Sequence, residues 1–134
     1  MTNTERAQKA IEFVLDYERK QERIAENVSA AREHSGYDVK SGDRLIEVKG
    51  VGESWKTYTW QALYKTERES LRNHPNVWFL YIVKFKDKES DEVVGFYIIP
   101  GVDLENKFCI DIESYGIRSI SQNTLKDFLR EDWK

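Results

Sequence analysis

Two acidic residues and a lysine stand at a spacing that could bind a metal ion: Asp38, Glu47 and Lys49. The surrounding residues, 36–50, have the apolar, β-branched positions of two short strands. Between these strands, Gly42-Asp43 has glycine at the first central position, as a two-residue type II′ loop requires. This loop would fix the register, so that Asp38 lies opposite Glu47 and Lys49 shares the face of Glu47.

Two interpretations of this hairpin remain open. Carboxylates that face each other across a sheet, roughly 5 Å apart at their β-carbons, repel. A divalent cation would relieve the repulsion, because hard cations such as Mg²⁺ take carboxylate oxygens and waters. Lys49 would then stabilise or help deprotonate an attacking water. The alternative is a hairpin with a solvated charged face, since 34% of the chain is charged and a Glu-x-Lys triplet arises easily by chance.

The composition limits the class of protein. With 134 residues, 40% of them hydrophobic, the chain suits a single globular domain over residues 1–134. The net charge of −3 gives no global basic field for a nucleic-acid partner. The single cysteine, Cys109, excludes an internal disulfide framework and a zinc site of several cysteines. No apolar run reaches the ~18 residues of a membrane span, and the N-terminus lacks the apolar core of a signal peptide, so we expect a cytoplasmic protein.

Hydrophobic periodicity predicts a helix over residues 4–22, ahead of the hairpin. Its apolar stripe ends at Glu18, which is either a residue at the rim of the core or a residue of the site. Residues 23–35 are expected to form a second helical piece or a packed loop.

The rest of the chain alternates strand and helix patterns. A helix over 66–73, with a capping-box pattern at its start, separates two strands and would serve as their crossover connection. This order predicts an α/β fold with a central mixed β-sheet flanked by helices. The further predicted strands are 55–63, a central buried strand 77–85, its partner 92–99, and short edge strands 108–112 and 117–120; a last helix is predicted over 122–133.

Several short segments follow the pattern of a known group of proteins. They are Tyr17-Glu18-Arg19, Asn27-Val28-Ser29, Gly36-Tyr37-Asp38 with Ser41, Ile46-Glu47-Val48-Lys49-Gly50, Thr66-Glu67 and Leu80-Tyr81-Ile82-Val83. In these segments the chain resembles the PD-(D/E)xK nuclease superfamily. Within it, the chain resembles the domain at the C-terminus of the No Vein protein, which also occurs in restriction- and helicase-associated proteins.

The resemblance implies a restriction-endonuclease-like core and a role for each matching residue of the hairpin. Asp38, Glu47 and the Val48 carbonyl would bind Mg²⁺ or Mn²⁺. Lys49 would orient the attacking water and stabilise the charge that develops on the phosphate. The literal Pro-Asp pair is absent, because Tyr37 precedes the aspartate.

Two further candidates come from the same resemblance. Glu18 matches the acid on the first helix that approaches the active site in many of these nucleases, where it would add a catalytic or metal-binding carboxylate. Gln61 matches a glutamine that often follows the lysine. Its spacing to Tyr64 is one residue shorter than the Gln-xxx-Tyr pattern of RecB-type nucleases.

We therefore expect a Mg²⁺-dependent endonuclease that hydrolyses phosphodiester bonds of nucleic acid, DNA in the first instance, in defence or repair. A homodimer would allow both strands of a duplex to be cut. The alternative is a catalytically silent module of the same fold that binds nucleic acid or a protein. Trp55 and Trp60 would stack on bases or pack in the core. The basic residues that would contact phosphates are Lys49, Lys56, Lys65, Arg68 and Arg72.

Overall fold

The computed structural model describes residues 1–30, 36–52, 58–111 and 116–134, without the side chains of 58–60, 109, 111, 118 and 119. Within these residues the chain forms a five-stranded sheet and a three-stranded sheet. In spatial order the larger sheet contains β1 (Ala25–Asn27), β2 (Val39–Ser41), β3 (Arg44–Val51), β5 (Trp78–Phe85) and β6 (Val93–Pro100). The smaller sheet contains β4 (Tyr58–Ala62), β8 (Gly116–Ser121) and β7 (Cys109–Asp111). The helices are α1 (Asn3–Lys20), α2 (Lys65–Asn73), α3 (Gly101–Lys107), α4 (Gln122–Leu125) and the 3-10 helix η1 (Lys126–Phe128).

The hairpin formed by β2 and β3 has the predicted register. Ser41 pairs with Arg44 and Val39 pairs with Ile46. Gly42 has φ 61°, the positive value that the first central position of a type II′ loop requires. The short loop therefore sets which side chains of β3 face each side of the sheet.

The middle of the large sheet is mixed, as predicted. β3 and β5 run parallel over seven residue pairs, and the connection between them includes α2. β5 is the most buried strand of the sheet and pairs antiparallel with β6. The apolar run at residues 77–85 thus forms an interior strand with covered faces, which confirms the mixed sheet flanked by helices.

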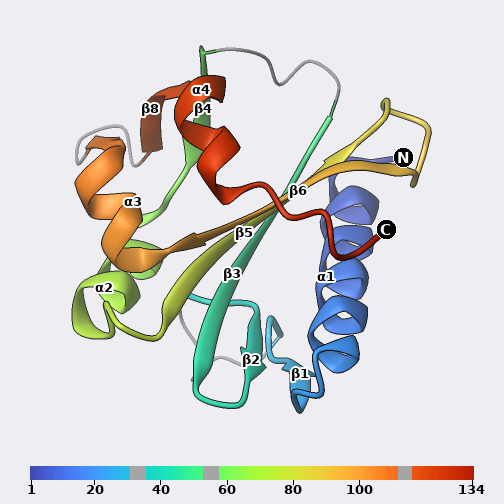
Figure 1. Ribbon diagram of the computed structural model, residues 1–134, viewed down its shortest axis with the longest axis horizontal. Coiled ribbons are helices and arrows are strands. Elements are labelled where there is room, and N and C mark those ends of the chain that lie inside the picture. Colours follow the sequence, from blue (N-terminus) through green and yellow to red (C-terminus); the bar gives the residue numbers. More distant parts are fainter. Residues whose placement is uncertain (31–35, 53–57, 112–115) are drawn as a thin grey trace.

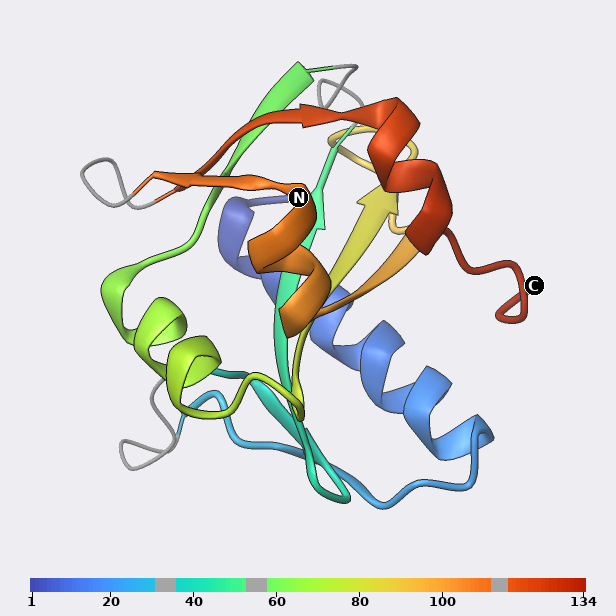
Figure 2. The same cartoon turned by 60° about the vertical axis from the view of Figure 1, so that its left-hand side comes forward.

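Two apolar cores lie on opposite faces of this sheet. Figure 1 shows α1 on the right of β3 and β5, and α2 and α3 on the left; the same division is visible after a turn of 60° (Figure 2). The core under α1 includes Ile11, Val14, Ile46, Val48 and Tyr81. The core on the other face includes Leu45, Val51, Leu63, Leu71 and Leu80. Alternation along β3 therefore directs Glu47 and Lys49 toward the α2 side.

Gly36 holds the start of the hairpin against α2. Its φ is 90°, and a β-carbon there would lie 2.4 Å from the Thr66 carbonyl oxygen and 2.6 Å from the Ser70 β-carbon. Its own carbonyl accepts a hydrogen bond of 2.9 Å from the Trp78 indole N–H. The close approach of Gly36 to α2 therefore holds Gly36 and Tyr37, the two residues before Asp38, near that helix.

The prediction was wrong for several elements. Part of residues 23–35 forms the strand β1, and residues 101–107 form the unpredicted helix α3 after Pro100. The strand predicted over 55–63 is confirmed in its described part as β4, which pairs with β8 in the smaller sheet. β8 is the middle strand of that sheet and not an edge. The last helix stops at Phe128, because Leu129 adopts an extended backbone that bridges to Tyr97.

We expect Gly36→Ala to lower the free energy of unfolding by about 3 kcal/mol, because the added β-carbon meets both positive φ and the backbone of α2. Gly42→Ala is the matched control, since Gly42 has positive φ with no atom within 4 Å of an added β-carbon. It should cost about 1 kcal/mol, the strain of the backbone alone. Urea unfolding of both variants measures the difference; equal losses would show that Gly36 does not pack tightly on α2.

Candidate functional site

Asp38 directly precedes Val39, the first residue of β2, where the hairpin meets α2. Its N–H donates to the carbonyl of Ile46, the partner of Val39, at 2.8 Å, so the regular ladder ends at Val39 and does not extend to a pair of Asp38 with Glu47. Its carboxyl group lies close enough to that of Glu47, which is only 7% exposed, for their negative charges to interact. The predicted meeting of these two carboxylates is therefore present in the structure.

The Val48 backbone belongs to the same cluster. Its N–H donates to Oδ2 of Asp38 at 3.0 Å. The N–H and C=O of one strand residue point to the same side, so the Val48 carbonyl also points toward the β2 side of the sheet. The Ile46 carbonyl points there as well, whereas the Leu45 N–H bonds to Val77 on the β5 side. At the start of β2, oxygen atoms therefore lie along one edge of β3; they belong to Asp38, Glu47 and the Val48 carbonyl.

Lys49 lies between two acidic side chains that come from different elements. Its Nζ is 3.3 Å from Oε1 of Glu47 on β3 and 2.6 Å from Oε1 of Glu67 on α2. The lysine side chain is only 14% exposed. Nζ also lies 5.5 Å from the centre of the Tyr64 ring, which is largely exposed. The ammonium group is therefore held in place on two sides and borders solvent beside an aromatic ring.

Glu67 is the residue of this cluster that sequence reasoning missed. It is 5% exposed, and its Oε2 accepts the Tyr64 N–H at 3.0 Å at the start of α2. The sequence pattern predicted that Thr66 opens this helix; the helix begins one residue earlier, with Tyr64 as its N-cap. With the helix start placed there, Glu67 would have been found at the third helical position, where a capping glutamate is expected.

The cluster contains more negative than positive charge. Burial, with the charges of Asp38 and Glu67, raises the pKa of Glu47 well above its ordinary value. Burial also raises the pKa of Asp38, against the opposing hydrogen bond from the Val48 N–H. For Lys49, burial alone would lower the pKa, but the charges of Glu47 and Glu67 outweigh it and raise the pKa. One lysine thus does not compensate the acids, and a proton or cation is favoured between Asp38 and Glu47.

The residues present fit a hard divalent cation with a small set of protein ligands. Among the described residues, no three His, Cys, Asp or Glu side chains are placed to hold a metal ion together. A metal ion here would therefore have the two carboxylates of Asp38 and Glu47, the Val48 carbonyl and water. Mg²⁺ commonly binds in this way, through one or two carboxylates with several retained waters.

Glu18 lies on the other face of the sheet, away from this cluster. It is completely buried, and Arg23 donates to both its carboxylate oxygens at 2.7 and 2.8 Å. The Tyr81 hydroxyl donates to Oε2 at 3.0 Å, and Tyr81 belongs to the core under α1. The structure thus corrects the expectation that Glu18 approaches the active site: this acid joins α1 to the start of β1 and to β5.

Gln61 is not joined to the cluster either. It lies on β4, opposite Ile117 of the smaller sheet. Among the hydrogen bonds and ion pairs of the described residues, none connects Gln61 with Asp38, Glu47 or Lys49. Lys56 and Trp55 lie outside the described residues, as does the side chain of Trp60. Of the predicted phosphate contacts, Lys65 is exposed and pairs with Glu69 at 3.9 Å.

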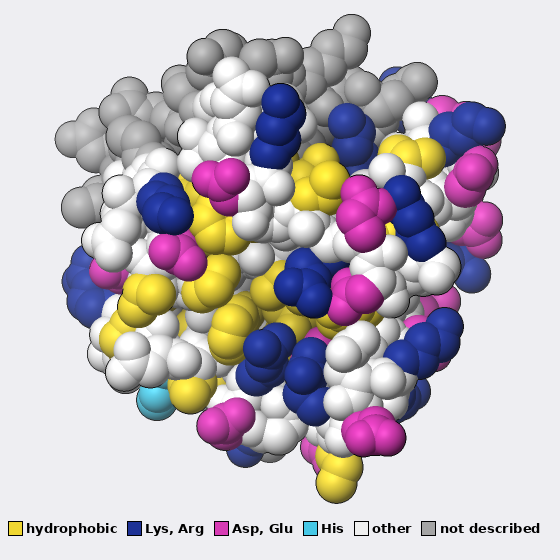
Figure 3. Space-filling view, viewed as in Figure 1, with side chains coloured by type: hydrophobic (Ala, Val, Ile, Leu, Met, Phe, Trp, Pro, Cys, Tyr) yellow, Lys and Arg dark blue, Asp and Glu magenta, His cyan; other side chains and the backbone are white. Residues whose placement is uncertain are grey.

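Charges of both signs are interspersed over the surface. Figure 3 shows dark blue basic side chains beside magenta acidic ones, with a group of basic side chains next to a yellow apolar area near the middle of that face. In the part of the chain that the structure describes, no helix has the length and apolar content to span a membrane. The surface therefore offers local rather than global positive charge.

The fold and the cluster define a class of protein: a mixed α/β domain with an acid–lysine cluster where a β-hairpin meets a crossover helix. The family model described as "Protein NO VEIN, C-terminal" matches residues 6–98, more than half of the chain. The chain belongs to this No Vein C-terminal family. A comparison with curated proteins finds no match. The matched residues include the whole cluster, from Asp38 to Glu67.

The position of Glu18 predicts a stability that depends on pH. Burial raises the pKa of Glu18, but the hydrogen bonds from Arg23 and Tyr81 outweigh it and leave the pKa below its ordinary value. Its contribution to the free energy of unfolding is therefore complete above the unfolded pKa, about 4.3, and is lost as the pH falls through the folded pKa. We expect Glu18→Gln to lose about 3 kcal/mol at pH 7, because Arg23 is left without its charge partner.

Urea unfolding at pH 7, 5, 4 and 3 tests this prediction. The difference between wild type and Glu18→Gln should shrink below pH 5. Glu12→Gln, at an exposed position on the same helix, is the control and should follow wild type. A difference that stays constant from pH 7 to pH 3 would contradict a lowered pKa for Glu18.

Proposed function

We propose that this chain is a divalent-metal-dependent nuclease that hydrolyses phosphodiester bonds of nucleic acid, DNA in the first instance. The observation that carries the proposal is the cluster of Asp38 and Glu47, whose charges interact, with the Val48 backbone bonded to Asp38 and the Lys49 ammonium beside Glu47. The resemblance of these residues to the metal ligands and lysine of PD-(D/E)xK nucleases supports it. The closeness of the half-buried Asp38 carboxylate to the buried Glu47 carboxylate supports it independently, because such a pair is unfavourable unless a proton or cation compensates it.

Asp38, Glu47 and the Val48 carbonyl would hold the metal ion at the start of β2. When bound, Mg²⁺ or Mn²⁺ would polarise the scissile phosphate and provide hydroxide near neutral pH. The backbone fixes the positions of these ligands. The Val48 N–H donates to the Asp38 carboxylate, and Glu47 extends from a strand that is paired with β5. The protein's part is thus to hold the ligands before the substrate arrives.

Lys49 would stabilise the negative charge that develops on the phosphate. It remains protonated near neutral pH, because Glu47 and Glu67 raise its pKa. Glu67 acts through Lys49, as a positioning residue that fixes the ammonium at 2.6 Å and is itself fixed by the Tyr64 N–H. A positioned ammonium costs no reorganisation in the transition state.

One observation favours a catalytically silent binding module as the second candidate. Lys49 is already satisfied by the two carboxylates, so the cluster can also be a structural link between β3 and α2. The two functions differ in what a metal ion does. Only the nuclease requires a cation between Asp38 and Glu47.

We expect 10 mM Mg²⁺ or Mn²⁺ to raise the melting temperature of wild type by about 4–7 °C, if the metal is present at ten times its Kd. The double variant Asp38→Ala with Glu47→Ala should lose this shift, because both carboxylate ligands are gone. Thermal unfolding with and without metal measures it, with Glu12→Ala and Glu131→Ala as a double control at exposed acids. An unchanged melting temperature of wild type would remove the metal site from the proposal.

We expect wild type to cut labelled DNA or RNA in the presence of Mg²⁺ or Mn²⁺, and Lys49→Ala to cut at least 100-fold more slowly while keeping the metal-induced rise in melting temperature. Glu67→Gln should slow cutting by about 10-fold, because it loosens Lys49 without removing a metal ligand. A gel assay over single- and double-stranded DNA and RNA measures both. Cutting that persists in Lys49→Ala would assign the activity to another site or to a contaminant.

A further inference from the structure

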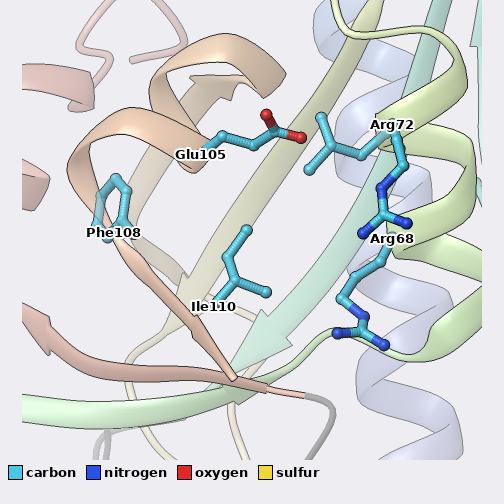
Figure 4. Close-up of a pocket in the computed structure, with 6 residues that line it drawn as sticks. Arg68, Arg72, Glu105, Phe108 and Ile110 are labelled. Carbon is cyan, nitrogen blue, oxygen red and sulfur yellow. The ribbon is translucent and has the colours of Figure 1, made fainter. Parts of the chain in front are cut away.

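A cavity of about 340 Å³ lies between α2 and the segment formed by α3 and β7. Its basic side is formed by α2, and its other side is formed by residues of α3 and of the segment that follows it (Figure 4). Its volume is within the range of small-molecule sites in proteins. The lining residues are Arg68, Leu71, Arg72, Glu105, Phe108 and Ile110.

The basic side of the cavity has the chemistry of a phosphate site. Arg68 and Arg72 are four residues apart, so they lie on the same side of α2. Figure 4 shows their guanidinium groups one above the other at the same wall. Guanidinium groups donate paired hydrogen bonds that match phosphate oxygens. Two of them at one wall of a cavity favour a phosphate group over a neutral ligand.

The opposite side has the chemistry of a base site. Phe108 and Ile110 are half-buried and lie across the cavity from the arginines, and the buried Leu71 also contributes to the lining. Glu105, which is exposed, extends from α3 at the rim. An aromatic ring stacks on a base, and a carboxylate accepts hydrogen bonds from the exocyclic amino group of cytosine or adenine. A carboxylate opposite two guanidinium groups suits a ligand with an anionic end and an amino-bearing end.

We propose that this cavity binds one nucleotide of a nucleic-acid strand, with its phosphate at Arg68 and Arg72 and its base between Phe108 and Glu105. This inference rests on the proposed function, because it takes the bound strand to be the substrate of the nuclease. Arg68 directly follows Glu67, the residue that holds Lys49, so α2 carries residues of both sites. A strand cut beside Lys49 would place a neighbouring nucleotide in the cavity.

A second groove, of about 350 Å³, carries less of this chemistry. It is lined by Arg44, Arg130 and apolar residues of β5 and β6, together with Asp103 and Asp127. The carboxylates of Asp103 and Asp127 in its lining oppose the binding of a phosphate group. Arg44 donates to the Tyr81 hydroxyl at 2.6 Å, and Arg130 pairs with Asp132 at 2.9 Å. Arg130 therefore provides the charge-matched control for Arg72.

Fluorescence anisotropy in metal-free buffer tests the proposal, with labelled single-stranded oligo-dC and oligo-dT as probes. Arg72→Gln should raise the Kd about 5–10-fold and reduce the slope of log Kd against log salt by about 0.7, the loss of one phosphate contact on a single strand. Arg130→Gln should leave both unchanged. Equal weakening by the two variants would show that binding depends on general charge attraction and not on the cavity, and would overturn the proposal.

The base side has its own variants. Phe108→Leu keeps the apolar packing against Phe128 but removes the aromatic ring, and should weaken binding about 5-fold or more. Wild type should prefer oligo-dC to oligo-dT, because thymine has no exocyclic amino group. Glu105→Ala should remove that preference without weakening the binding of oligo-dT. Loss of binding to both probes in Glu105→Ala, or no preference in wild type, would contradict the assigned place of the base.

Two further arms separate the possible outcomes. We expect dCMP to compete with the oligonucleotides only at millimolar concentration. Competition at micromolar concentration would assign the cavity to a free nucleotide and overturn the proposal that it binds a strand. If the binding results hold and wild type cuts nothing, the nuclease proposal fails and the cavity stands. If wild type cuts and Arg72→Gln and Phe108→Leu bind as wild type does, the cavity fails and the nuclease stands.

Discussion

One buried lysine connects the two elements on which the site depends. Lys49 comes from the middle strand of the sheet, and its shortest ion pair is with Glu67 at the start of α2. The same ammonium lies beside Glu47, whose other neighbour is Asp38. Because one positive charge serves several acids, the position of each carboxylate is coupled to the others. The local charge balance then depends on the crossover geometry that brings α2 over β3.

That geometry follows from two backbone constraints. The two-residue loop at Gly42 sets the alternation of β3, so that Glu47 and Lys49 face α2 while Ile46 and Val48 face α1. The close approach of Gly36 to α2 then brings the start of β2 to the same place. Neither constraint involves a side chain of the cluster. The stability of the surrounding fold therefore offsets the repulsion between the carboxylates, as is common in functional sites.

The sequence predicted the parts of the site that depend on local geometry. The face that Glu47 and Lys49 share, and the place of Asp38 at the start of β2, follow from a short loop and strand alternation, which act over a few residues. Glu67 is 18 residues from Lys49 and reaches it only through the parallel pairing of β3 with β5. Glu18 was placed at the site by the resemblance, and the helical stripe could not correct this, because it shows which side of α1 is buried but not which face of the sheet that side covers. α3 and the separate sheet of β4 depend likewise on tertiary packing that overrides local pattern.

The family match ends between the two sides of the proposed nucleotide pocket. The match covers residues 6–98, which include the acid–lysine cluster and the two arginines of α2. The other side of the cavity, Glu105, Phe108 and Ile110, belongs to the segment that follows. The phosphate side of the proposed nucleotide pocket is thus part of the family domain, whereas its base side is added by α3 and β7. If phosphate contacts position a strand and base contacts specify it, the reaction would belong to the family domain and the nucleotide preference to the residues after 98.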